Sequence, residues 1–170
     1  MPYSLINLCS RLLTDNNLTI AFAECSTGGR ITSDFSTVSD ATSFLKGGLI
    51  CFDNAMLEQL LSIPKEMIEN YTPESSEVAE AITYGLRQVI DADIHIGITG
   101  LIKPAGNEHY EKPIGTMFVH STFHGKFLFS KRYNFQGDAS TIITQTTMQL
   151  AYQLRHELTS LLQSKVMVTQ

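Results

Sequence analysis

Residues 18–30 are L-T-I-A-F-A-E-C-S-T-G-G-R, an alternating apolar run that leads into a small turn closed by two glycines. Leu18, Ile20 and Phe22 alternate along the chain, which is typical of a β-strand over residues 18–23. Gly28 and Gly29 permit positive φ angles and let a ligand approach backbone N–H groups. The stretch therefore predicts a strand, a tight turn and, from about Arg30, a helix whose first amides favour an anion.

The turn also places a thiol beside a hydroxyl, at Cys25 and Ser26. A thiol at the positive end of a helix dipole is expected to have a lowered pKa, so the turn suits a nucleophile. The amides around Thr27 to Gly29 are then expected to hold an oxyanion. The alternative is that a strand–helix turn needs glycine and small residues for its geometry alone. The residues by themselves leave both interpretations open.

Periodicity along the rest of the chain predicts further elements. Helices are expected over residues 5–13, after a cap at Asn54, from Thr72-Pro73-Glu74 to Ile90, and after a cap at Asp138. Strands are expected over residues 49–52, after a break at Gly47-Gly48, and over 93–99. Residues 116–121 and 127–133 flank His124-Gly125 as a hairpin. About five strands mixed with helices predict an α/β fold in which helices cover the faces of a mixed sheet.

Composition narrows the classes of function. The formal net charge is −5, and no basic run is longer than Lys131-Arg132, so no nucleic-acid partner is expected. No apolar stretch approaches the roughly 18 residues of a membrane span, and no signal peptide is expected, so no membrane partner is predicted. The three cysteines form no C-x-x-C motif, which predicts free thiols and a cytoplasmic location. The five histidines have no tight metal-binding spacing, so neither a metal nor a cofactor is expected.

Six short blocks follow the order and spacing of one known family. A-E-C-S-T-G-G resembles the A-E-S-C-T-G-G signature of the CinA C-terminal domain family, whose members include competence/damage-inducible proteins and bacterial nicotinamide-nucleotide amidohydrolases. Five other blocks are similar to family motifs: G-G-L-I-C-F-D-N (47–54), S-S-E-V-A (75–79), I-T-G-L-I-K-P-A-G (98–106), K-P-I-G-T-M (112–117) and F-Q-G-D (135–138). The resemblance extends from about residue 5 to residue 162.

The resemblance implies a single three-layer α/β/α domain over residues 1–170 that self-associates into a homo-oligomer. It also implies hydrolysis of the carboxamide of nicotinamide mononucleotide, without metal, by a serine nucleophile assisted by a lysine. Cys25 and Ser26 are therefore the expected catalytic residues. The expected ligand-binding residues are Glu24, Thr27, Gly28, Gly29, Phe52, Asn54, Thr99, Gly100, Lys103, Gly106 and Gly115.

The sequence departs from the family pattern where the chemistry is expected. The serine and cysteine of the signature have traded places, so the nucleophile position is Cys25. Leu57 stands at the lysine position and Ala139 at the position of an arginine suited to a phosphate. General-base assistance is worth about 10²–10⁴-fold, so this loss is large. Two functions follow: a divergent amidohydrolase acting on a pyridine nucleotide or related amide, or a catalytically silent protein that binds such a ligand or acts through assembly.

Two side chains carry alternatives of their own. Lys103 follows the T-G of the third strand, so it is either a relocated cation of the pocket or a solvated loop lysine. Glu24 ends the first strand, and it either orients the pocket by hydrogen bonding or caps the following turn. Cys9 and Cys51 are expected to be small core residues.

Overall fold

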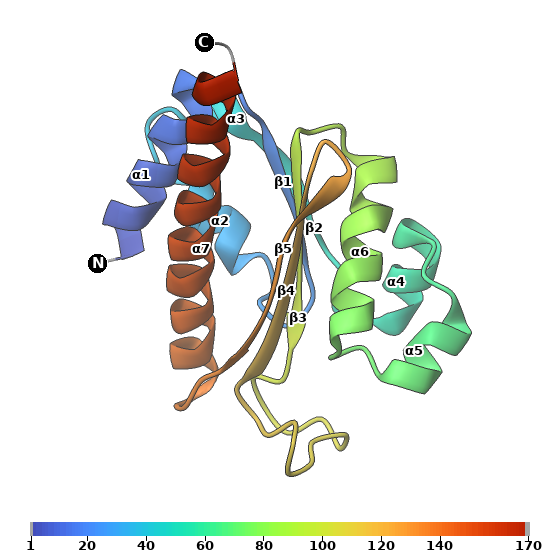
Figure 1. The fold of residues 1–170 in the computed structure, drawn as a ribbon. Coiled ribbons are helices and arrows are strands. Elements are labelled where there is room, and N and C mark those ends of the chain that lie inside the picture. The colour runs from blue at the N-terminus through green and yellow to red at the C-terminus, as the bar shows by residue number, and fades with distance from the viewer. Residues whose placement is uncertain (1, 169–170) are drawn as a thin grey trace.

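A computed structural model describes residues 2–168 of the chain. Residue 1 and residues 169–170, the ends of the expected single domain, lie outside the described residues. Five strands form one sheet in the order β2-β1-β3-β4-β5 (Figure 1). They are β1 (Ile20–Glu24), β2 (Leu45–Ile50), β3 (Ile94–Gly100), β4 (Thr116–Phe123) and β5 (Lys126–Asn134). β1 pairs in parallel with β2 and β3, whereas β4 pairs antiparallel with β3 and β5, which confirms the predicted mixed sheet.

Helices cover both faces of this sheet and make three layers (Figure 1). One face carries α1 (Pro2–Asp15), α2 (Arg30–Ser36), α3 (Ala41–Phe44) and α7 (Ala139–Val168). The other face carries α4 (Asn54–Leu61), α5 (Lys65–Tyr71) and α6 (Ser76–Val89). No helix within residues 2–168 has both the length and the apolar character needed to cross a bilayer. The predicted three-layer α/β/α architecture is therefore confirmed.

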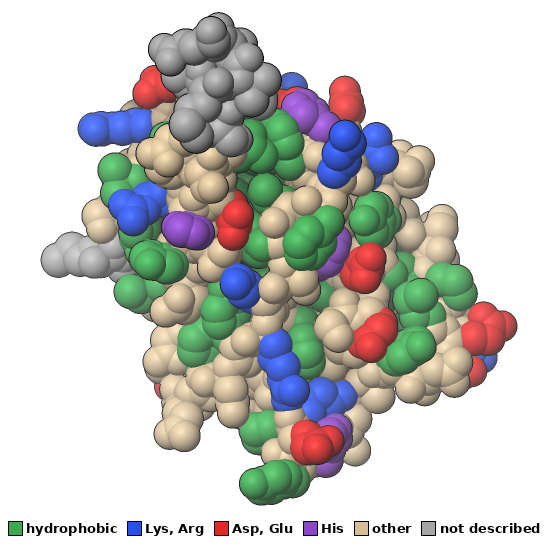
Figure 2. Space-filling view, in the orientation of Figure 1, with side chains coloured by type: hydrophobic (Ala, Val, Ile, Leu, Met, Phe, Trp, Pro, Cys, Tyr) green, Lys and Arg blue, Asp and Glu red, His purple; other side chains and the backbone are tan. Residues whose placement is uncertain are grey.

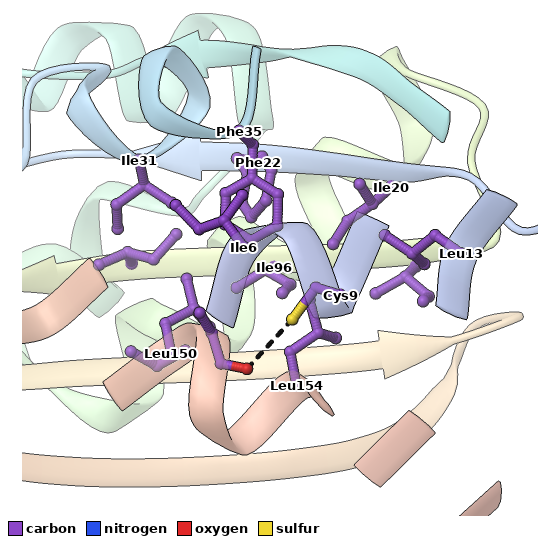
Figure 3. Packing of buried hydrophobic residues seen from close by; sticks show 14 of the residues in the cluster. Ile6, Cys9, Leu13, Ile20, Phe22, Ile31, Phe35, Ile96, Leu150 and Leu154 are labelled. Atoms are coloured by element: carbon purple, nitrogen blue, oxygen red, sulfur yellow. Dashed lines mark hydrogen bonds between the residues drawn. The ribbon is translucent and has the colours of Figure 1, made fainter. Parts of the chain in front are cut away.

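The alternation of β1 divides its side chains between two cores. Ile20 and Phe22 point toward α1, α2 and α7, where Phe22 packs on Phe35 with ring centroids 5.0 Å apart (Figure 3). Ala21 and Ala23 point the other way, into a second cluster under α4 and α6. Because successive side chains of a strand alternate between faces, this division follows directly from the sequence of the strand.

Small residues on the second face let α6 approach the sheet closely. Gly97 of β3 lies directly under α6, and a Cβ at this position would be 2.5 Å from Thr83 Oγ1 and 2.6 Å from the carbonyl oxygen of Ala79. The Thr83 hydroxyl donates to Ala79 O at 2.7 Å. At Gly97 the sheet therefore leaves no room for a side chain beneath α6.

Three local predictions are corrected. Gly47-Gly48 does not break the chain before a strand but lies inside β2, because Gly48 leaves room for Thr32 and for the carbonyl oxygen of Phe22. The cap of α4 is the side chain of Asp53, which accepts from Ala55 N at 2.8 Å, rather than that of Asn54.

The third correction concerns α6, which begins at Ser76 rather than at Thr72-Pro73-Glu74. The hydroxyl oxygen of Ser75 accepts from Val78 N, so Ser75 is the N-cap. By contrast, the predicted cap of the last helix is confirmed, because Asp138 Oδ1 accepts from Thr141 N at 2.8 Å.

The surface drawn in Figure 2 carries charges of both signs. Lys and Arg side chains are interspersed with Asp and Glu and with single hydrophobic side chains on this face. The sequence as a whole has 12 basic and 17 acidic residues.

Candidate functional site

The carboxyl ends of three parallel strands meet at one edge of the sheet and form a cavity of about 150 Å³. This edge is a usual place for ligands in open α/β sheets. The loop after β3 and the segment before α6 complete the walls. The lining residues are Cys25, Ser26, Cys51, Phe52, Asn54, Leu57, Pro73, Glu74, Thr99, Gly100, Leu101, Ile102, Lys103 and Ala105.

The turn after β1 is organised by one buried carboxylate. Glu24 is fully buried, and its Oε2 accepts from Thr27 Oγ1 at 2.7 Å and from the N–H groups of Gly29 and Ile31 at 3.1 Å. Its Oε1 accepts from the N–H group and the hydroxyl of Thr32 at 2.7 and 2.6 Å. Glu24 therefore caps α2, and of the two roles expected from the sequence the structure displays the capping one.

This arrangement occupies amides that were expected to hold an oxyanion. Gly29 N donates to Glu24, and Gly28 N donates to the carbonyl oxygen of Cys25 at 3.2 Å. The N–H groups of Gly28 and Gly29 are therefore already bonded within the turn.

Cys25 lies in the cavity wall, but its ionisation differs from the expectation. Burial raises the pKa of the Cys25 thiol to about 12. The neighbouring Cys51 and the carboxylates of Glu74 and Glu24 act in the same direction, and a hydrogen bond with Thr99 opposes them. The predicted lowering of this pKa is wrong because the helix amides face Glu24, whereas Cys25 faces a buried, acidic environment.

Ser26 lines the same cavity, and its hydroxyl oxygen is buried without a hydrogen-bond partner among the described residues. A buried hydroxyl of this kind is available to a polar ligand group. Among the residues that the structure describes, no histidine lines the cavity. Its lysine is Lys103, which is exposed.

An apolar side chain occupies the position at which the family has its lysine. Leu57 of α4 is 1% exposed and lines the cavity beside the two thiols. Phe52 forms the rim and is 64% exposed, and the Lys103 ammonium lies over its ring at 5.5 Å from the centroid. Lys103 is therefore an exposed loop residue that also borders the cavity.

The sequence did not single out Glu74 as a site residue, yet its carboxylate borders the cavity. Glu74 accepts a hydrogen bond from the side-chain amide of Asn107, and its backbone carbonyl accepts from Lys112 Nζ at 3.3 Å. The hydroxyl of Thr99 donates to the carbonyl of Pro73 at 2.9 Å, which ties this segment to the end of β3. The sequence marked Glu74 only as part of the Thr72-Pro73-Glu74 triplet at an expected helix start. That Glu74 lies near Cys25 depends on the order of the strands, which the triplet does not encode. The other lining residues that sequence reasoning missed are Cys51, Pro73, Leu101, Ile102 and Ala105.

The structure thus brings some expected residues together and separates others. Those in the cavity wall are Cys25, Ser26, Phe52, Asn54, Thr99, Gly100 and Lys103. Glu24, Thr27, Gly28 and Gly29 shape the turn behind it, and Ala139 begins α7. Gly115 packs against Phe135 and donates to the carbonyl of Leu101, and Gly106 N donates to Glu108 at 2.8 Å. Neither glycine lines the cavity.

Metal donors are not gathered in the described part of the chain. Within residues 2–168 no three His, Cys, Asp or Glu side chains lie close enough together to hold a metal ion.

Comparison with known proteins agrees with this architecture. The model of the CinA C-terminal domain matches residues 3–158. A CinA-like protein of Thermotoga neapolitana is 33% identical over 154 residues, which cover 87% of this chain and 36% of that protein. A CinA-like protein of Dictyoglomus thermophilum is also 33% identical, over 88% of this chain and 36% of its own length. The chain thus spans about a third of the length of these curated relatives.

Solved structures show the same fold. A CinA superfamily protein of Klebsiella pneumoniae superimposes with a TM-score of 0.88 at 23% identity, over 94% of this chain and 99% of that one. A CinA superfamily protein of Escherichia coli gives a TM-score of 0.81 at 28% identity, over 89% of each chain. An α/β domain with a cavity at its strand ends is thereby defined as a CinA-type domain. The chain belongs to the CinA C-terminal domain family.

Proposed function

We propose that this domain binds the carboxamide ring of a pyridine nucleotide, or a related amide, in the cavity at Cys25 and holds it without hydrolysing it. The observation that carries the proposal is the burial of the Cys25 thiol in the cavity wall beside Leu57. Burial raises the pKa of this thiol to about 12, so the thiolate, which is the nucleophilic form, is scarce near pH 7. Leu57, beside it, cannot accept a proton.

The size and lining of the cavity support such a ligand. A cavity of about 150 Å³ is large enough for one benzene-sized ring, and a pyridine ring has that size. Phe52 offers an aromatic surface at the rim. The Glu74 carboxylate suits the donating NH₂ of a carboxamide, and the unpartnered Ser26 hydroxyl suits its carbonyl oxygen. A ring that enters from the rim would leave any sugar or phosphate outside, near Lys103.

Ligand binding is tested by thermal shift and calorimetry with nicotinamide mononucleotide, nicotinamide riboside, nicotinamide and nicotinate mononucleotide. We expect the carboxamides to raise the melting temperature more than the carboxylate, because a second carboxylate repels Glu74. Glu74→Gln should weaken binding about tenfold or more, since charge-assisted hydrogen bonds are worth about 1.5–3 kcal/mol. Glu77→Gln, an exposed neighbour outside the cavity, is the matched control. Absence of binding by all four compounds contradicts the proposal.

A slow amidohydrolase is the second candidate, because the Cys25 thiol lines the cavity beside a Ser26 hydroxyl that has no hydrogen-bond partner among the described residues. In that reaction sulfur attacks the carboxamide carbon, the C–N bond breaks, and ammonia leaves with the thiol proton. Water then hydrolyses the thioester and restores the thiol. Ammonia release above that of Cys25→Ala, increasing steeply toward alkaline pH, would establish hydrolysis. Ammonia release equal to that of Cys25→Ala would rule out hydrolysis and leave ligand binding as the proposed function.

Further expectations concern the domain organisation, assembly, location and partners of the protein. We propose that residues 1–170 form a single CinA C-terminal-like domain, which predicts one cooperative unfolding transition. A homo-oligomer in the cytoplasm, without a nucleic-acid or membrane partner, stays a prediction. Light scattering of the purified chain tests the assembly, and cell fractionation tests the location.

A further inference from the structure

Two cysteines far apart in the sequence occupy facing positions at the ends of neighbouring strands. In the parallel register of β1 and β2, Ala23 pairs with Leu49 and Glu24 with Ile50, so the next facing positions are Cys25 and Cys51. Cys51 N donates to the carbonyl oxygen of Glu24 at 2.8 Å, which continues the ladder to this point. Neighbouring strands lie about 4.7–4.9 Å apart, and disulfide-bonded cysteines have Cα separations of about 4.4–6.8 Å.

Both thiols also face the same space. Cys25 and Cys51 belong to the second core cluster, on the α4 and α6 side of the sheet, together with Ala21 and Ala23 of β1, and Leu49 of β2 packs against the same cluster. Both are free, and both line the cavity. Cys25 is 8% exposed and Cys51 1% exposed, so a small oxidant in the cavity meets Cys25 first.

We propose that Cys25 and Cys51 form a reversible intramolecular disulfide at the base of the cavity, with a peroxide as oxidant. The Cys25 thiolate attacks one peroxide oxygen, the O–O bond breaks, and a sulfenic acid and hydroxide form. The Cys51 thiolate then attacks the sulfenic sulfur, the S–O bond breaks, and a second hydroxide leaves. The two thiol protons convert both hydroxides to water, so the sulfurs lose two electrons and hydrogen peroxide gains them.

The geometry predicts an easily reduced disulfide. Disulfide bonding requires the Cβ atoms to close to about 3.8 Å, which is less than the spacing of two strands. Neither cysteine lies inside a strand, so the chain ends after Glu24 and Ile50 have to draw together. A distorted disulfide is more readily reduced, so a dithiol reductant should restore both thiols.

The third cysteine provides an internal control. Cys9 of α1 lies on the opposite face of the sheet, is 0% exposed, and donates through its thiol to the carbonyl oxygen of Ala151 at 3.1 Å (Figure 3). It belongs to the first core cluster and not to the one that holds Cys25 and Cys51. The sheet separates Cys9 from both, so it should stay a thiol.

The surroundings of Cys25 also predict the rate of oxidation. Glu74, Cys51 and Lys103 line the same cavity as Cys25, and Thr99 contributes a hydrogen bond. The Glu24 carboxylate acts on Cys25 by charge from the turn behind the cavity. Because only the thiolate attacks peroxide, oxidation should be slow near pH 7 and accelerate about tenfold for each unit of pH up to about pH 10.

The test uses the full chain treated with hydrogen peroxide, quenched, unfolded and alkylated with N-ethylmaleimide, followed by intact-mass and peptide mapping. We expect loss of two hydrogen atoms, a disulfide-linked peptide pair containing Cys25 and Cys51, and a single adduct at Cys9. Dithiothreitol should restore alkylation at every cysteine. Cys9→Ala should oxidise like the wild type, whereas Cys51→Ala and Cys51→Ser should give no disulfide.

Several outcomes overturn the inference. They are full alkylation of Cys25 and Cys51 at alkaline pH after peroxide treatment, a disulfide that includes Cys9, and over-oxidation of Cys25 in the wild type without a disulfide. Circular dichroism of the two Cys51 variants identifies a variant that fails to fold, and the wild-type peptide map decides the question without them.

A consequence for ligand binding rests on the proposed function. Joining the sulfurs consumes the thiol of Cys25 and contracts the cavity base, so the oxidised protein should bind the carboxamide ligand at least tenfold more weakly than the reduced protein. If the reduced protein binds no ligand, the proposed function fails, while the mass measurement still decides the disulfide. Equal binding by both forms would contradict the coupling.

Discussion

The thiol of Cys25 lies among groups that all disfavour its negative form. It is buried, a second thiol faces it, and the carboxylates of Glu74 and Glu24 are close enough to raise its pKa. The macrodipole of α2 cannot compensate, because the first amides of that helix already bind Glu24. The chemistry of a side chain at a strand–helix turn therefore depends on where the amides point and not only on their presence.

Alkylation of Cys25 by iodoacetamide measures this directly. With a pKa of about 12, its rate should increase about tenfold per pH unit from about pH 7 to pH 10 without levelling off. Mass spectrometry of the Cys25 peptide gives the rate at this residue alone. A free small-molecule thiol with a pKa of about 8.5 is the control and should level off near pH 9. A plateau for Cys25 below pH 9 would show that the thiol is activated.

Glu24 is the residue on which the turn depends. Glu24→Gln replaces one acceptor oxygen by an NH₂ group that faces backbone donors, and a buried donor without an acceptor costs about 1–3 kcal/mol. We expect the free energy of unfolding to fall by about 2–4 kcal/mol, measured by urea denaturation. Glu66→Gln, an exposed carboxylate in the first turn of α5, should have a far smaller effect. Equal effects of the two substitutions would refute the capping role.

At the scale of the elements, the close approach of α6 to β3 depends on the absence of a side chain at Gly97. Gly97→Ala places a methyl group about 2.5 Å from Thr83 Oγ1, closer than packed atoms approach. Because Ala79 O lies at a similar distance, α6 has to shift, and overpacking of this kind typically costs about 1–3 kcal/mol. Urea denaturation should show this loss. Gln88→Ala on the exposed side of α6 is the matched control, and a neutral Gly97→Ala would contradict the close packing.

Most elements of this fold could be predicted from periodicity. Alternating apolar residues predicted β1, and apolar residues at helical spacing predicted α1 and the last helix. His124-Gly125 marked the hairpin between β4 and β5. β2 was placed too late because Gly47-Gly48 is typical of a turn, and only the side chain of Thr32 packed over Gly48 shows why a strand needs glycine there. α5 was missed because a seven-residue helix carries too few turns for its period to stand out.

The site was predictable only in part, because its geometry depends on how the strands and helices are arranged. The signature turn located Cys25, and the block at residues 98–106 located Thr99 and Lys103. The approach of Cys51 and Glu74 to Cys25 depends on strand register and on the segment that precedes α6, which no local pattern encodes. The hydrogen bonds of Glu24 likewise depend on the path of the turn.

At the scale of the whole molecule, buried titratable groups on both faces of the sheet set the pH range of stability. His95 and His120 are 1% and 3% exposed, and burial lowers the pKa of each imidazole. The unfolded chain therefore binds protons that the folded chain does not once the pH falls below about 6.5. The free energy of unfolding should decrease as the pH falls from about 6.5 toward about 5.

Urea denaturation at a series of pH values tests this acid limb. Asp40 and Asp93 have lowered pKa values, mainly through hydrogen bonds from Ser10 and Thr19, so their contribution is lost only below about pH 4. His120→Gln should make the dependence between pH 6.5 and 5 shallower. His156→Gln, which removes an exposed imidazole on α7, is the control. If the free energy of unfolding of His120→Gln depended on pH as in the wild type, the decrease in stability at acid pH would come from other groups.

The buried thiols predict a decrease in stability at alkaline pH, because their pKa values are raised rather than lowered. Burial raises the pKa of Cys9, and likewise that of Cys25, from 9.0 to about 12. The unfolded chain releases these protons as the pH rises above about 9 while the folded chain keeps them, so stability should fall from pH 9 upward. Cys9→Ala removes one of the two groups without touching the cavity. The variant should be less stable at pH 7, because it loses packing, but its stability should fall less between pH 9 and pH 11 than that of the wild type. Parallel decreases in the two proteins would mean that Cys9 ionises as readily in the folded state as in the unfolded one.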